Sequence, residues 1–159
     1  MKTIIQTYSF ENLLVSQGHI VYTNVGYSML PLLRQKKDII EIERKESKRC
    51  QKYDVVLYKR GDKYILHRIL KVRPCDYVIA GDHCINIEQG ITDDQILGVM
   101  TRVIRNGKEI KVTDLGYQLY VHLWCDCYPI RMFILRGKRS AYRVLRKIKR
   151  MVINKKNTP

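Results

Sequence analysis

Ser28 stands in a setting that suits a nucleophile. It lies in the run Gly26-Tyr27-Ser28-Met29-Leu30-Pro31, directly after a segment of strand-like residues. A glycine shortly before a serine and a proline shortly after it favour a sharp exit from a sheet. There the hydroxyl is exposed, and neighbouring backbone N–H groups can point at a substrate carbonyl. A serine hydroxyl becomes a good nucleophile only when a base removes its proton. Without such a base, the alternative is an ordinary turn serine.

His67 is a candidate for that base. Alternation along the run Tyr64–Leu70 puts Ile65, His67 and Ile69 on one face of a predicted strand. We expect this face to be half-buried, and a neutral imidazole with an ordinary pKa of about 6.5 suits a general base at neutral pH. A core histidine with satisfied hydrogen bonds is the alternative. Spacing alone does not exclude the other three histidines, His19, His83 and His122.

Asp82 is a candidate for the third group of such an arrangement. It follows Gly81 at the end of a predicted strand, and Glu88 comes shortly after it. An aspartate at this place is commonly a turn residue. In a Ser-His-Asp arrangement it would instead accept a hydrogen bond from the histidine and hold the imidazole in the required tautomer.

These segments, in this order, resemble the S24/S26 peptidase superfamily of type I signal peptidases and self-cleaving repressors. Ser28–Pro31 matches the Ser-Met-x-Pro nucleophile box, and His67-Arg68 matches the histidine form of the base box, found in signal peptidases of the endoplasmic-reticulum and spore-former type. Gly81-Asp82 matches the Gly-Asp-Asn box, with Glu88 at the place of its second acid. The resemblance spans roughly Leu13–Val103. Its weaker boxes are Lys37-Asp38, Tyr53-Asp54 and Gln95–Val99.

The resemblance implies a serine endopeptidase that needs no metal or organic cofactor. Ser28 would form the acyl-enzyme, His67 would act as general base and Asp82 would orient His67. The backbone around Ser28, between Gly26 and Met29, would stabilise the oxyanion. Besides Lys37, which stands where the family pattern has glycine, the chain departs from that pattern at two positions, and the membrane spans of signal peptidases are missing. The second acid is Glu88 rather than aspartate, and Gly26 stands where signal peptidases often carry a serine that completes the oxyanion hole.

Short strand-like segments fill most of residues 1–115 and predict an all-β domain. No helical pattern separates them, which favours an antiparallel barrel or sandwich, as in signal peptidases and repressor C-terminal domains. A short helix is expected before them, with Ser9 as N-cap and Gly18 just past its end. The predicted strands are His19–Val25, Asp38–Arg44, Tyr53–Lys59, Lys63–Val72, Asp76–Ala80, Leu97–Ile104 and Glu109–Thr113.

Residues 116–159 change character and predict a helical, strongly basic C-terminal extension. Tyr117–Leu135 is apolar and helical in pattern, with a break near Pro129, and Ala141–Val152 is amphipathic with a basic face. The net charge of the chain is +15, and residues 131–159 hold 11 Lys/Arg and no Asp/Glu. Such asymmetry predicts an anionic partner, either a membrane surface contacted through residues 131–153, a nucleic acid or an acidic protein. The alternative is a helix docked on the domain by its apolar face.

The cysteines and the N-terminal residues predict a cytoplasmic location. The five cysteines are irregularly spaced, and Met1–Gln17 has no basic region followed by an apolar run, so we expect free thiols in a reducing compartment. Cys125 and Cys127 near His122 are a weak metal signal. Leu119–Leu135 is interrupted by Asp126, Pro129 and Arg131, and spanning a membrane takes about 20 apolar residues. We therefore expect an active site in the cytoplasm, peripheral to the inner membrane face through the Ala141–Val152 helix.

Three functions remain open at this point. The first is an endopeptidase that removes a leader or pro-segment from a client peptide. The second is a self-cleaving repressor or other nucleic-acid-binding regulator. However, only 27 residues precede Ser28, and resembling repressors use lysine as base. The third is a peptide-binding relative without peptidase activity.

Overall fold

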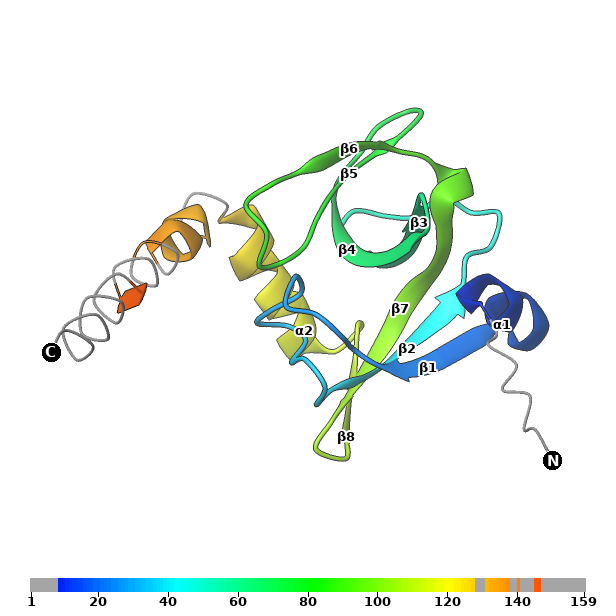
Figure 1. Ribbon diagram of the computed structural model, residues 1–159, viewed down its shortest axis with the longest axis horizontal. Coiled ribbons are helices and arrows are strands. Elements are labelled where there is room, and N and C mark those ends of the chain that lie inside the picture. The colour runs from blue at the N-terminus through cyan, green and yellow to red at the C-terminus, as the bar shows by residue number, and fades with distance from the viewer. Residues whose placement is uncertain (1–8, 128–130, 138–139, 141–144, 147–159) are drawn as a thin grey trace, which may run out of the picture.

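The computed structural model describes residues 9–127, 131–137, 140 and 145–146, and its centre is one antiparallel sheet (Figure 1). Eight strands run in the order β1-β2-β7-β3-β4-β5-β6, with β8 paired to β7. Because β1 and β6 stand at the two ends of this order and do not pair, the sheet is open, and of the two predicted forms, barrel or sandwich, a closed barrel is not formed. The strands are β1 (His19–Thr23), β2 (Ile39–Arg44), β3 (Val55–Arg60), β4 (Lys63–Val72), β5 (Tyr77–Ala80), β6 (Glu88–Ile91), β7 (Ile96–Arg105) and β8 (Lys108–Lys111).

The predicted antiparallel β class is confirmed, and one strand was missed. Seven strands overlap the segments expected from sequence, and β4 has the predicted bounds. The eighth, β6, reads Glu-Gln-Gly-Ile, which has neither alternation nor β-branched enrichment before its last residue. Its pairing with β5 holds it in the sheet. A 3₁₀ turn, η1 (Asp93–Gln95), leads from β6 into β7.

The N-terminal helix α1 (Phe10–Gln17) is confirmed together with both of its caps. The Ser9 hydroxyl accepts a hydrogen bond from the Asn12 N–H at 3.2 Å. Gly18 follows the helix with a φ of 76°, a left-handed conformation that favours glycine, and its N–H donates to the Leu14 carbonyl. The helix buries Leu14 against the sheet.

Strand β3 is buried on both faces and divides the core in two. Val55 and Leu57 pack into a core shared with the loop after β1, while Val56 and Tyr58 pack into a second core with β5. A strand covered on both sides reads as a continuous apolar run, as Val-Val-Leu-Tyr does here. In the register with β4, Val56 pairs with His67. The centre of the sheet thus fixes the position of His67.

The C-terminal part of the described chain packs onto this sheet. Helix α2 (Leu115–Val121) continues into a π-helical segment, η2 (His122–Asp126), and residues 131–137 are helical. Tyr117 and Val121 are buried in the first core. Figure 1 shows α2 beside the loops that join β1 to β2 and β5 to β6.

The predicted helix Ala141–Val152 and the break at Pro129 lie outside the described residues, apart from Leu145 and Arg146. These two are helical and exposed. Within the described part of the chain, no helix has the length and apolar character needed to cross a membrane.

Candidate active site

Ser28 lies in the loop between β1 and β2, at the turn that follows Gly26. Gly26 has a φ of 114°, which a residue with a side chain rarely adopts, so glycine suits this exit from the sheet. Ser28 is half-buried, while the next side chain, Met29, is 1% exposed and packs into the first core. The Leu33 N–H donates to the Met29 carbonyl at 2.9 Å. The buried Met29 thus fixes the backbone that carries Ser28.

A buried carboxylate anchors the other end of this loop. Asp38 is fully buried and binds the Arg34 Nε at 2.9 Å and the Arg105 Nη2 at 2.6 Å. The Arg105 Nη2 also donates to the Leu32 carbonyl within the loop. Burial raises the pKa of Asp38, but hydrogen bonds from Arg105 and Arg34 outweigh it and bring the pKa to about 2.

His67 is buried in β4 and its Nδ1 contacts two polar groups. The Glu88 Oε1 lies 3.2 Å from Nδ1, and the Tyr58 hydroxyl lies 3.3 Å from it. Glu88 is the first residue of β6, and its other oxygen binds the Arg60 Nη1. The carboxylate that contacts His67 is therefore that of Glu88.

Asp82 has a different partner from the one expected. Its carboxylate is completely buried and accepts two hydrogen bonds from Arg68, from Nε at 2.9 Å and from Nη2 at 2.8 Å. The Tyr120 hydroxyl donates to it at 2.9 Å. The expectation that Asp82 orients His67 is corrected, because Glu88 holds the Nδ1 side of the ring. The physical reason is strand alternation, since consecutive residues of a strand point to opposite faces and Asp82 lies on the Arg68 side.

Gly81 brings the Ser28 loop and His67 together. A Cβ added to Gly81 would stand 2.5 Å from the Ser28 carbonyl oxygen, 2.8 Å from the Cys84 Sγ and 3.0 Å from the His67 Cδ2. The His83 N–H donates to the same Ser28 carbonyl at 2.7 Å. Cδ2 is bonded to Nε2, so the edge of the ring away from Glu88 faces the Ser28 segment. The Ser28 hydroxyl and the ring form no hydrogen bond in this structure.

The surroundings of His67 favour the neutral imidazole. Its burial lowers the pKa, and this outweighs the opposing effect of the Glu88 carboxylate. The Arg60 cation lowers the pKa further. A ring that is neutral at neutral pH, with Nδ1 held by an acid, can accept a proton at Nε2.

A groove of about 450 Å³ opens beside Ser28. Its lining is mainly aromatic and aliphatic, and it runs from α1 across β1 to the start of β4. Such a surface suits the apolar side chains of an extended peptide. The lining residues are Phe10, Tyr22, Asn24, Val25, Ser28, Leu57, Tyr64, Ile65 and Leu66.

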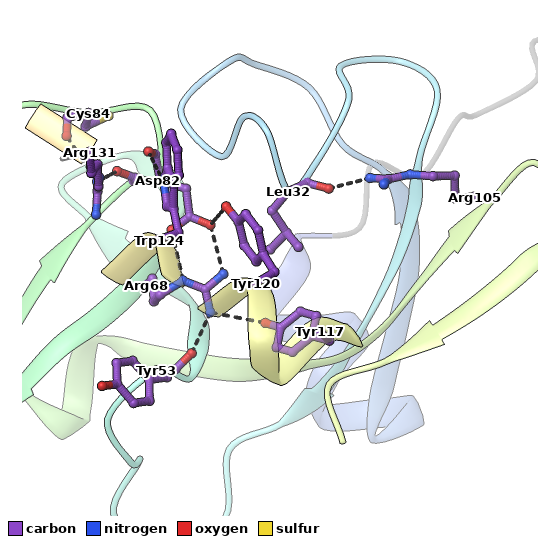
Figure 2. A network of polar contacts seen from close by, with 11 residues as sticks. Leu32, Tyr53, Arg68, Asp82, Cys84, Arg105, Tyr117, Tyr120, Trp124 and Arg131 are labelled. Atoms are coloured by element: carbon purple, nitrogen blue, oxygen red, sulfur yellow. Dashed lines mark hydrogen bonds and ion pairs between the residues drawn. The ribbon is translucent and has the colours of Figure 1, made fainter. Parts of the chain in front are cut away.

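Side chains after residue 115 bind Arg68 and the loop that follows β5 (Figure 2). The Arg68 Nη1 donates to the Tyr117 hydroxyl at 3.2 Å, and the Trp124 Nε1 donates to the Asp82 carbonyl at 2.9 Å. The Arg131 Nη2 donates to the Gly81 carbonyl at 2.5 Å. Sequence reasoning missed these residues and Tyr58, because no motif or spacing marks them.

The remaining histidines and the cysteines do not form a second site in the described chain. His19 and His122 are exposed, and the His122 Nδ1 is 2.8 Å from the Asp126 carboxylate. Cys125 and Cys127 are free thiols, as are the other three cysteines. Among the described residues, no group of three His, Cys, Asp or Glu side chains is arranged to hold a metal ion.

Comparisons with known proteins give no relative. No protein-family model, no curated protein and no solved structure matches the chain. The geometry around Gly81 is therefore the basis for a functional assignment.

Proposed function

We propose that the protein is a serine endopeptidase of signal-peptidase type, with Ser28 as nucleophile, His67 as general base and Glu88 as the acid that orients His67. The observation that carries this proposal is the shared contact at Gly81. The Ser28 carbonyl and the Cδ2 edge of His67 both lie against this glycine, while the Nδ1 of the same ring lies 3.2 Å from Glu88. A nucleophile, a base and an orienting acid in this order constitute a Ser-His-acid arrangement.

The reaction follows from the roles of these atoms. On substrate binding, the Ser28 hydroxyl turns toward Nε2, gives up its proton and attacks the peptide carbonyl carbon. The tetrahedral intermediate expels the amine, which takes the proton from His67, and an ester on Ser28 remains. Water then gives a proton to His67 and attacks this ester, releasing the acid product and restoring the Ser28 hydroxyl. Backbone N–H groups near Ser28 stabilise the oxyanion, each by a factor of roughly 10²–10³.

The substrate class is an extended leader or pro-segment of a client peptide. The groove beside Ser28 supports this choice, because its apolar lining suits aliphatic side chains on the acyl side of the cleaved bond. Most of its residues come from β1, α1 and the β3–β4 hairpin, so one extended peptide can contact all of them.

Covalent labelling tests the nucleophile directly. A serine-directed fluorophosphonate should label the wild-type protein once, and both Ser28→Ala and His67→Ala should remove the labelling. Ser16→Ala is the matched control, because the Ser16 hydroxyl is exposed on α1 and bonds only its own helix. Labelling that survives in Ser28→Ala overturns the proposal.

We propose further that the protein works in the cytoplasm, at an anionic membrane surface. Three leucines spaced four residues apart on α2 and η2 support the membrane contact, since Leu115, Leu119 and Leu123 are 86%, 59% and 62% exposed. The 11 basic residues after position 130 supply the attraction, at about 1 kcal/mol each near such a surface.

Vesicle flotation tests the membrane proposal. The wild-type protein should float with vesicles containing phosphatidylserine at low salt, and Leu119→Ser should weaken the binding. Thr113→Ser, a polar exchange next to the helix, is the control. A protein that ignores these vesicles but binds generic duplex DNA in a salt-sensitive way would instead support the nucleic-acid regulator.

A further inference from the structure

We infer that Arg131 is a positioning residue for the candidate active site, and that the described helical residues 115–126 and 131–137 complete that site. The inference rests on the proposed function for its catalytic meaning. Its structural part, the restraint of the loop at residues 81–84, can be measured without any activity.

Arg131 holds the loop between Ser28 and His67. Its side chain is 1% exposed, and its Nη2 donates to the Gly81 carbonyl at 2.5 Å and to the Cys84 carbonyl at 3.1 Å. Between Gly81 and Cys84 in the chain, the Asp82 carbonyl accepts a hydrogen bond from the Trp124 Nε1. Three carbonyls within residues 81–84 are therefore fixed by side chains that come from η2 and the helix at 131–137 (Figure 2).

This loop sets the distance between the two reacting residues. A side chain at Gly81 would meet both the Ser28 carbonyl and the His67 ring, and the His83 N–H binds that same carbonyl. Any shift of the loop therefore moves Ser28 relative to His67. A displacement of about 1 Å between reacting groups can lower a rate by roughly 10²-fold. Arg131 acts through this loop, so it is not a catalytic residue.

The stability of the fold alone does not explain why an arginine is buried at position 131. Among the described residues, its Nε and Nη1 are buried without a hydrogen-bond partner, and its Nη2 binds carbonyl oxygens rather than a carboxylate. Buried N–H groups without partners and an unpaired buried charge both destabilise a fold. A methionine of similar length would fill the same space without these penalties, although the Gly81 and Cys84 carbonyls would lose their donor. A residue that lowers the stability of the fold beside a candidate site is typical of residues that serve function rather than stability.

The test compares Arg131→Met and Arg131→Lys with Arg136→Met, a matched change at an exposed arginine of the same helix. In Arg131→Met, the His83 and Cys84 amides should exchange with solvent about tenfold faster, while the amides of β5 stay unchanged. The melting temperature should change little, because the loss of two hydrogen bonds offsets the removal of the unpaired buried N–H groups. The maximal rate of fluorophosphonate labelling should fall about tenfold at an unchanged half-saturating concentration. Arg131→Lys, which keeps a donor for the two carbonyls, should restore part of the protection and of the rate.

Two results would overturn the inference. One is unchanged exchange at His83 and Cys84 in Arg131→Met. The other is a fall in melting temperature with faster exchange throughout the sheet, which indicates a purely structural role. If the wild-type protein takes no label, the proposed function fails, and the exchange measurement still decides whether Arg131 restrains the loop.

Discussion

His67 and Arg68 are neighbours on β4, yet each binds a different acid. His67 contacts Glu88 on one face of the sheet, and Arg68 forms a two-hydrogen-bond pair with Asp82 on the other. Strand β4 thus places two different acid contacts on its two faces. One acid faces the candidate base, and the other closes a fully buried ion pair that supports the loop after β5.

Replacing each acid by its amide should separate these two tasks. Glu88→Gln keeps the shape but loses the charge that orients the ring, so the labelling rate should fall about 10²-fold. Its melting temperature should change little, because the Arg60 partner of Glu88 is largely exposed. Asp82→Asn leaves Arg68 as an unpaired buried charge and should cost about 3–5 kcal/mol in the free energy of unfolding. Labelling kinetics and urea unfolding measure the two effects. An inactive but stable Asp82→Asn, beside a fully active Glu88→Gln, would reverse the assignment.

The labelling rate should depend on pH through His67. Burial lowers the pKa of His67 below 6.5, so the rate should rise with pH through an inflection below 6.5 and level off at neutral pH. The Glu88 charge raises this pKa, so Glu88→Gln should move the inflection to still lower pH. The checks are rate profiles of both proteins with the same probe. An inflection above 6.5 would contradict the burial of a neutral imidazole.

Gly81→Ala should disable the site without unfolding the protein. The new methyl group would meet the Ser28 carbonyl at 2.5 Å, which is backbone and cannot simply rotate away. The Ser28 segment must therefore move, and the labelling rate should fall by roughly 10²-fold or more. Gly116→Ala is the control, because a Cβ there meets nothing within 4 Å. As a glycine within a helix, it should gain about 0.5–1 kcal/mol in stability on becoming alanine. Equal labelling of the two variants would show that the contact at Gly81 has no effect on the site.

Acid should weaken the anchor of the Ser28 loop at Asp38. The pKa of Asp38 is about 2 in the folded protein against 3.8 for a free side chain, so the ionised form favours folding. This stabilisation is complete above pH 3.8 and is lost as the pH falls through about 2. By linkage it amounts to about 2 kcal/mol. Urea unfolding of Asp38→Asn should show a deficit of about this size at pH 6 that shrinks toward pH 2. Asp62→Asn, in the exposed turn between β3 and β4, is the control and should change the free energy of unfolding at pH 6 little.

Local patterns predicted the parts of the fold that depend on local physics. The caps of α1 and the bounds of β4 follow from residue types and alternation within a few positions. β6 does not, since its short glycine-containing segment is a strand only because β5 lies beside it. That the sheet is open could not be predicted from the sequence either, because closure depends on whether β1 and β6 pair in the completed fold.

In the candidate site, too, local patterns predicted some features, while others depend on the completed fold. Alternation correctly predicted that His67 shares a face with Ile65 and Ile69. The resemblance marked Glu88 as a second acid, and its carboxylate lies 3.2 Å from the His67 Nδ1. The partner of Asp82 was misjudged, because no local pattern says which face of β4 the loop after β5 approaches. The contacts of Tyr117, Trp124 and Arg131 join segments more than 40 positions apart in the chain, so they depend on the completed fold.

The order of these segments along the chain has a consequence for biosynthesis. All the strands precede residue 112, whereas Trp124 and Arg131 follow them. Chains emerge from the ribosome N-terminus first, so the sheet can form while the loop at residues 81–84 is still unrestrained. By the inference drawn above for Arg131, Ser28 and His67 take up their final spacing after the later helices have docked. Under the proposed function, the candidate nucleophile and base of a nascent chain are therefore not yet set for cleavage, which would spare the unfinished protein and its neighbours on the ribosome.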